Sequence, residues 1–374
     1  MTGQATNTNP FRPSFGITPA VVIGREGIDL QVRLALEEGA GSPYRFTLIS
    51  GARGSGKTVL LNLLEHTARE MGWHVIRVPA SADMLTELTN VRLPELLNTI
   101  DPDAHTTTVT SGSIAGLGSI SVDHTQRYTS TPSIRSLLRT AAEYAAEQHS
   151  GIFLTLDELQ SAQTDLLHTF TDAVQDIVRD NLPIALAVAG LPYEVSELLQ
   201  LPGTTFLRRA VPIELTTLST TQINQLLQET AHLGHRSFTA EALSQATTAT
   251  HGSVFIAQLI GSISYTLADG DTITENTVDE AIPLLRDRVN LQVIRPALRD
   301  MPDNELTYLH AAAQLTTSDA ESISTAKVAE FLGKQPNSVT SARRSLIHRG
   351  LIEPAGHGYV KLTDPYLREY LLDQ

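Results

Sequence analysis

The sequence predicts an α/β protein in three parts: a core built on a parallel sheet, a helical unit, and a C-terminal winged helix–turn–helix. Three observations support this fold class. Short apolar segments alternate with amphipathic helices between residues 44 and 215, the pattern of strand–helix–strand crossovers in a parallel sheet. From about residue 217 the pattern becomes helical. After Pro302 the composition changes again, to a compact helical segment and a final pair of strands.

Length and composition restrict the class of protein. A chain of 374 residues is expected to form two or three domains. It is 41% hydrophobic and 18% charged, carries a net charge of −14 and contains no cysteine. The lack of cysteine excludes disulfides and cysteine-ligated zinc, and the acidity argues against a surface that coats nucleic acid everywhere. The sequence shows no pattern of a signal peptide or membrane span, so we expect a cytoplasmic protein without a membrane partner.

The elements of the core follow from local patterns. We expect a flexible tail at 1–15, the core at 16–216, a helical lid at 217–298 and the winged helix domain at 299–374. The predicted strands of the core lie at 44–50, 74–80, 151–159, 183–192 and 206–215, and the predicted lid helices at 219–234, 239–249, 252–268 and 275–298. A Thr/Ser/Gly-rich stretch at 104–131 predicts a hairpin-like insertion, either a plain surface hairpin or a loop that touches a partner or DNA.

The segment "GARGSGKT" after the first strand has the pattern G-x-x-x-x-G-K-[ST] of a phosphate-binding loop. Its glycines allow positive φ and a close approach of backbone N–H groups to phosphate oxygens. The helix that begins there directs the positive end of its dipole at the same place. We therefore expect a nucleotide site formed by Gly51, Ala52, Arg53, Gly54, Ser55, Gly56, Lys57 and Thr58. Lys57 would reach the β- and γ-phosphates, and the Thr58 hydroxyl would ligate Mg²⁺.

A phosphate loop also needs a carboxylate at the end of a neighbouring strand. The buried run "IFLTLDE" places Asp157 there, as a second Mg²⁺ ligand, and the adjacent Glu158 could polarise the attacking water. The alternative is that the two acids cap the next helix. Together with the phosphate loop, they favour an ATPase that uses ATP and Mg²⁺.

These motifs resemble those of the AAA+ superfamily, and within it archaeal origin-recognition ATPases and the related signal-transduction ATPases with numerous domains. The resemblance rests on "VIGRE" (22–26), "GARGSGKT", "LTLDE", "AGLP" and "FLRRA". It implies that Val22 and Ile23 line an adenine pocket. It also implies that Arg208 or Arg209 serves as an arginine finger for a neighbouring subunit; otherwise they are a surface pair bound to local carboxylates.

Two departures from the AAA+ pattern concern turnover. The strand end that usually carries a polar sensor reads Val188-Ala189-Gly190, and the lid segment "THGSVFIAQLIG" lacks the arginine that many AAA+ lids direct at the nucleotide. We therefore expect slow hydrolysis, or a switch that stays loaded with ATP.

The segment 324–362 has the pattern of a winged helix–turn–helix. Ser324 or Thr325 caps a first helix, a second runs from about Pro336 to His348, and "LIEP" and "YVKL" form the wing. Val339, Ala342 and Leu346 share the core face of the second helix.

The opposite face and the flanks of this second helix offer a confined positive patch, with no acid between Lys334 and Arg349. The candidate DNA contacts are Lys334, Asn337, Ser341, Arg343, Arg344, His348 and Arg349. A role in protein binding or packing remains the alternative for this module.

The leading hypothesis is a slow ATPase whose nucleotide state controls DNA binding through the winged helix and controls self-assembly. A nucleotide-gated signalling switch that binds a protein partner with little turnover is the first alternative. A loader or targeting ATPase of a mobile element or defence system is the second, and it would share every motif above.

Overall fold

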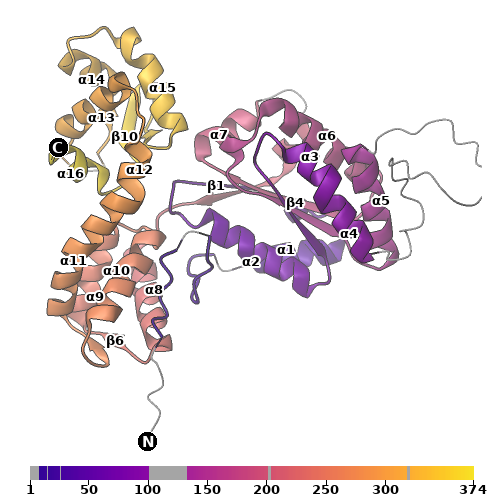
Figure 1. Cartoon of the computed structure of the whole chain (residues 1–374), viewed down its shortest axis with the longest axis horizontal. Helices are drawn as coiled ribbons and strands as arrows, with labels where there is room; N and C mark the ends of the chain where they lie inside the picture. The colour runs from indigo at the N-terminus through magenta and orange to yellow at the C-terminus, as the bar shows by residue number, and fades with distance from the viewer. Residues whose placement is uncertain (1–7, 15, 26, 101–132, 201–203, 318–320) are drawn as a thin grey trace, which may run out of the picture.

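The structure, a computed structural model, describes residues 8–14, 16–25, 27–100, 133–200, 204–317 and 321–374 (Figure 1). The hairpin-like insertion predicted at 104–131 lies outside these residues, and so does Glu26 of the "VIGRE" motif.

Five described strands form one parallel sheet in the order β2-β3-β4-β1-β5, which confirms the predicted α/β core. Strands β3 and β4 are buried along their whole length, as strands inside a parallel sheet covered by helices require, whereas the edge strands β2 and β5 each expose a charged residue, Arg77 and Glu214. The strands are β1 (Phe46–Gly51), β2 (His74–Val78), β3 (Ile152–Leu156), β4 (Ile184–Gly190) and β5 (Val211–Leu215). The phosphate loop follows β1, which lies between β4 and β5, so the candidate site starts from the interior of the sheet.

Helices cover both faces of the sheet (Figure 1). Side chains alternate along each strand, so Leu48 packs into one hydrophobic cluster and its neighbour Ile49 into another. The cluster with Ile49 includes α1 (Ile28–Glu38) and α2 (Lys57–Glu70), and the cluster with Leu48 includes α3 (Met84–Glu87), α4 (Leu93–Ile100), α5 (Ile134–Glu147) and α6 (Thr164–Arg179). A short helix, α7 (Pro192–Leu198), follows β4 directly.

The region that the sequence analysis assigned to a lid is mostly helical, and it also contains two short paired strands that the sequence analysis missed. Its helices are α8 (Thr220–Leu233), α9 (Ala240–Thr250), α10 (Val254–Leu267), α11 (Glu275–Val289) and α12 (Arg295–Leu298), and its strands are β6 (Ser237–Phe238) and β7 (Thr272–Ile273). Ser219 caps α8 with a capping box, and Ser253 caps α10.

The tail predicted at 1–15 requires a correction over residues 8–14. Phe11 is only 4% exposed and packs against Gly261 and Tyr265 of α10. The Asn9 side chain donates to the Ser262 carbonyl oxygen at 3.0 Å, and the Arg12 N–H donates to Gln258 Oε1 at 2.9 Å. Burial of this one aromatic ring offsets the cost of ordering a polar segment, which composition alone did not indicate.

The C-terminal part contains three helices and a three-stranded antiparallel sheet of order β8-β10-β9, followed by a last helix. Its elements are α13 (Asp303–Leu315), β8 (Ile323–Ser324), α14 (Thr325–Phe331), α15 (Thr340–His348), β9 (Ile352–Pro354), β10 (Tyr359–Leu362) and α16 (Leu367–Leu372). A 3-10 turn at Pro336–Val339 precedes α15. Val339, Ala342 and Leu346 are all buried, which confirms the predicted core face.

The lid and the C-terminal part share one continuous hydrophobic cluster, which also contains Phe11. The two units therefore do not have separate cores. No helix in the described part of the chain has the length and apolarity needed to cross a membrane.

Candidate functional site

The loop between β1 and α2 has a backbone shape that depends on glycine at three places. Gly54 and Gly56 adopt positive φ, at 75° and 93°. A Cβ on Gly51 would lie 2.4 Å from Ser55 Oγ and 2.9 Å from the Leu215 carbonyl oxygen, so only glycine fits between the loop and β5. The loop is therefore a tight turn that presents backbone to its concave side.

Lys57 is buried at the first turn of α2, and its ammonium group lies inside this loop. Its Nζ donates to the carbonyl oxygens of Gly51 at 2.9 Å and Ala52 at 3.0 Å. Burial lowers the pKa of Lys57, and the negative charges of Glu158 and Asp157 oppose that shift. A buried cation held by neutral carbonyl groups is well placed to attract an anion.

The two acidic residues at the end of β3 take different positions. The Thr58 hydroxyl donates to Asp157 Oδ2 at 2.5 Å, which joins the start of α2 to the end of β3, two strands away from β1 in the sheet. The Glu158 side chain is exposed, and the backbone N–H of Glu158 donates to Asp157 Oδ1 at 2.9 Å. Glu158 has φ 53° and ψ 50°, a left-handed conformation that costs a non-glycine residue about 1 kcal/mol or more. Such strain is often found at functional sites.

A small cavity beside the phosphate loop contains both residues expected in an adenine pocket. Val22 and Ile23 line it together with Ser55 and Gly56. Lid residues close its other side: Leu218, Leu226 and Val254. The cavity therefore lies between the sheet core and the helical region that follows β5.

Arg25 was missed as a site residue, although it stands within the quoted "VIGRE" motif. It lines the same cavity, and its guanidinium donates to the carbonyl oxygens of Ser55 at 3.0 Å and Gly24 at 2.8 Å. No sequence pattern predicted that Leu218, Leu226 and Val254 line this cavity, because only the packing of α8 and α10 brings them to the loop. Phe255 of α10 also lies next to Gly54.

Arg208 and Arg209 are exposed in the 3-10 turn that precedes β5. Because β5 runs parallel to β1, the two arginines lie where the strands begin, at the end of the sheet opposite the phosphate loop. The sheet is about 15–20 Å long in this direction. Neither arginine is placed to act on the nucleotide of its own chain, and the Arg208 Nε instead donates to the Leu199 carbonyl oxygen at 2.8 Å.

The candidate DNA residues divide into two groups. Lys334, Asn337, Ser341 and Arg344 are exposed on or before α15. Arg349 forms an ion pair with the buried Glu305 at 3.0 Å, and Arg343 lies half-buried beside Tyr308. Two of the four basic residues in the predicted patch are therefore partly engaged within the C-terminal part itself.

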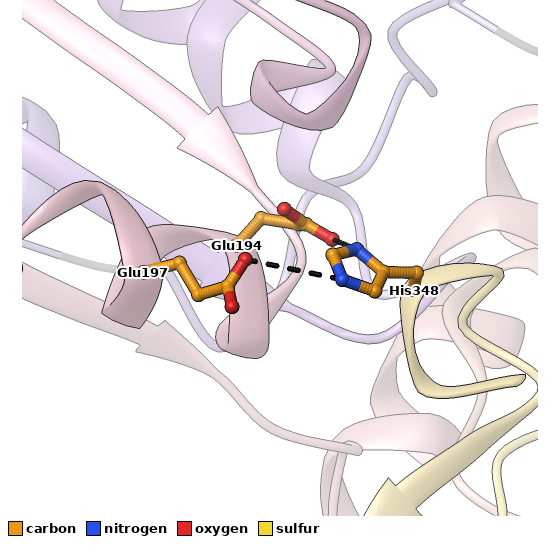
Figure 2. Close-up of side chains that lie close together, drawn as sticks. All are labelled: Glu194, Glu197 and His348. Atoms are coloured by element: carbon orange, nitrogen blue, oxygen red, sulfur yellow. Dashed lines mark hydrogen bonds and ion pairs between the residues drawn. The ribbon is translucent and has the colours of Figure 1, made fainter. Parts of the chain in front are cut away.

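His348, at the end of α15, is directed toward the core rather than away from it (Figure 2). Its Nδ1 lies 2.6 Å from Glu194 Oε1 of α7, and its ring packs edge-on against Tyr193, with centroids 4.9 Å apart. Two residues further on, a Cβ on Gly350 would lie 3.0 Å from Leu191 and 3.3 Å from Arg53 Nε. The C-terminal part thus contacts both α7 and the phosphate loop.

Comparison with protein families identifies two regions of the chain. Residues 21–186 match a family described as "AAA ATPase domain", and residues 291–371 match one described as "Domain of unknown function (DUF8462)". No curated protein sequence matches the chain at a significant level.

Solved structures resemble the chain over nearly its full length. The ORC2 protein of Aeropyrum pernix, solved as ADPNP-ADP complexes, has 16% identity and a TM-score of 0.63, with 96% of this chain and 95% of that one covered. A Walker-type ATPase of Pyrococcus abyssi has 16% identity and a TM-score of 0.62, with coverage of 94% and 96%. Cdc6p from Pyrobaculum aerophilum has 17% identity and a TM-score of 0.50, with coverage of 96% and 97%.

The phosphate loop on a β2-β3-β4-β1-β5 parallel sheet, with the acidic strand end beside it, defines a P-loop ATPase fold. With the family match over residues 21–186, the core is an AAA+ P-loop ATPase domain, and the chain resembles origin-recognition-type proteins in fold. This confirms the resemblance drawn from the motifs.

Proposed function

We propose that the protein binds ATP with Mg²⁺ in the phosphate loop, hydrolyses it slowly, and uses the nucleotide state to control DNA binding by its C-terminal part. One observation carries the nucleotide part of this proposal. The loop built around Gly51, the Lys57 ammonium bonded within it and the Thr58–Asp157 hydrogen bond meet at the carboxyl ends of β1 and β3, two strands of the sheet that β4 separates.

The donor set fits magnesium. Thr58 Oγ1 and Asp157 Oδ2 are oxygen ligands that already lie 2.5 Å apart, and Mg²⁺ binds through one or two protein oxygens plus phosphate oxygens and water. When bound, the ion would neutralise charge on the phosphates. Lys57 would hold the β- and γ-phosphates, and exposed Glu158 would accept a proton from, or orient, the attacking water.

We further propose that residues 299–374 form a winged helix–turn–helix with α15 as the recognition helix. The order α13–β8–α14–α15–β9–β10 supports this, because β9 and β10 pair as a hairpin after α15. The exposed Lys334, Asn337, Ser341 and Arg344 would meet the duplex. His348 would reach DNA only after leaving α7, so release of this contact is part of the proposal.

Steady-state ATP hydrolysis by wild type and Glu158→Gln, with and without duplex DNA, tests the proposal. We expect turnover that DNA stimulates and that falls about 100-fold or more in the variant, while ATP still binds. Glu143→Gln, an exposed carboxylate on α5, is the matched control and should leave turnover unchanged. ATP binding without measurable turnover in wild type would contradict the hydrolytic part.

A nucleotide-gated switch with a protein partner is the second candidate. It is favoured by the apolar end of β4, Val188-Ala189-Gly190, and by the lack of arginine in the lid segment 250–261. Absence of any DNA effect on turnover or on ATP affinity would favour this candidate. We also propose self-assembly, which is supported by the exposure of Arg208 and Arg209 at the end of the sheet away from the phosphate loop of their own chain, where an arginine finger would be presented to a second copy.

A further inference from the structure

We propose that His348 and Glu197, with Glu194 holding the histidine ring in place, form a binding site for a divalent transition-metal cation such as Zn²⁺, and that this cation fastens the C-terminal part to α7. These side chains come from segments about 150 residues apart in the sequence, and they face one another across the contact between core and C-terminal part (Figure 2). One ligand atom from each residue lies within 4.8 Å of the others.

The imidazole has one nitrogen available for an ion. Its Nδ1 lies 2.6 Å from Glu194 Oε1, a distance that corresponds to an N–H donating to the carboxylate. Glu194 is mostly buried, at 12% exposure, so it holds the ring in a fixed orientation. A carboxylate on the far nitrogen of a metal-binding histidine is a common arrangement, since it fixes the tautomer and raises the basicity of the ligating nitrogen.

The other nitrogen faces the second carboxylate. Nε2 of His348 lies 3.9 Å from Glu197 Oε2. Two atoms bound to one zinc ion at about 2.0–2.2 Å are about 3.0–3.5 Å apart, so a shift of about 0.5 Å brings the pair to ligand spacing. Both side chains are about half exposed, at 43% and 46%, and can make that movement.

Tyr193 supports the second ligand. Its hydroxyl donates to Glu197 Oε1 at 2.5 Å, which leaves Oε2 for the ion. Nitrogen and carboxylate oxygen ligands suit zinc and its first-row neighbours better than magnesium.

Binding of a cation would restrain the position of the C-terminal part relative to α7. Glu194 and Glu197 belong to the helix that follows β4. His348 ends α15, two residues before Gly350, where an added Cβ would lie 3.3 Å from Arg53 Nε of the phosphate loop. A cation at this place would keep the C-terminal part beside the nucleotide site. The proposal does not depend on DNA binding or on hydrolysis.

Zinc titration of the full chain without an affinity tag, by calorimetry in nucleotide-free buffer, tests the site. We expect a zinc-binding event in wild type that is weakened about 10- to 100-fold in His348→Ala and in Glu197→Gln. His66→Ala is the matched control, because His66 is an exposed histidine paired with a single carboxylate, Glu70, at 3.2 Å. Equal zinc affinity in wild type, His348→Ala and Glu197→Gln would overturn the proposal.

A second measurement tests whether zinc restrains the C-terminal part relative to the core, rather than how tightly zinc binds. Because the chain has no cysteine, Glu147→Cys on α5 and Lys327→Cys on α14 would label only two exposed positions with a fluorescent pair. Zinc should narrow the distribution of distances between the dyes, and His348→Ala should abolish that effect. Zinc binding that leaves the distribution unchanged, or widens it, would show that the cluster is held only by its own ion pairs and would overturn the clamp.

Discussion

Two helices of this protein, α2 and α15, each begin after a turn and carry cationic residues that the sequence marks as anion contacts. In α2 a single lysine is buried in the phosphate loop and bonded to two carbonyl oxygens. Around α15 the basic residues divide, since Arg344 is exposed whereas Arg349 is paired with Glu305.

The difference follows from what fixes each cation. The phosphate loop requires glycine at Gly51 and positive φ at two further positions, so the motif and its geometry are inseparable. The residues around α15 form a patch only by composition. In that case tertiary contacts decide which charges face outward, and one pattern of residues is compatible with several roles.

The largest expected effect concerns the lysine of α2. Lys57→Ala removes the cation that would hold the β- and γ-phosphates, and we expect ATP affinity to fall about 100-fold or more, or roughly 3 kcal/mol. Calorimetric titration with ATP and Mg²⁺ measures this change. Lys327→Ala, on the exposed face of α14, is the control. Tight ATP binding by Lys57→Ala would remove the functional distinction between the two helices.

The next prediction concerns how α2 is fixed to the sheet. Glu65 is 2% exposed and accepts hydrogen bonds from Arg77 of β2 and Thr155 of β3. Glu65→Ala leaves the buried Thr155 hydroxyl without its acceptor, and we expect a loss of about 2 kcal/mol in the free energy of unfolding, measured by urea denaturation. Glu70→Ala, an exposed glutamate of the same helix, should shift the midpoint far less.

The same residue predicts a dependence of stability on acid. Burial alone would raise the pKa of Glu65, but the hydrogen bonds from Arg77, Thr155 and Arg69 outweigh it and lower the pKa. A carboxyl whose pKa is lower in the folded state stabilises the fold above its unfolded pKa, about 4.3, and loses that contribution as the pH falls through the folded value. Wild type should therefore lose more unfolding free energy than Glu65→Gln on acidification below pH 5. Parallel losses in both would show that the Glu65 bonds are weak.

The smallest effect concerns α15. Arg344→Ala should weaken DNA binding a few-fold and reduce the slope of log affinity against log salt by about 0.9, because one phosphate contact and its released counterion are lost.

Arg349→Ala should instead lower the stability of the C-terminal part, since it leaves buried Glu305 without its ion pair. Fluorescence anisotropy at several salt concentrations separates the two. An unchanged salt slope in Arg344→Ala would remove α15 from the DNA hypothesis.

The sequence by itself determined the succession of strands and helices along the core, the phosphate loop and the acidic residues at the end of β3. It could do so because each of these depends on local properties: apolar runs, glycine conformation and residues at fixed spacing. It also predicted the buried face of α15, since helical periodicity places Val339, Ala342 and Leu346 on one side.

Only the tertiary structure decided which distant segments meet. It brought Leu218 and Val254 of the lid to the phosphate loop, packed Phe11 on α10, and set His348 of α15 against Glu194 of α7. No local pattern encodes these contacts, because each depends on how helices far apart in sequence pack around a shared core. The conformation of the phosphate loop could therefore be predicted from its residues, whereas its contact with the C-terminal part could not.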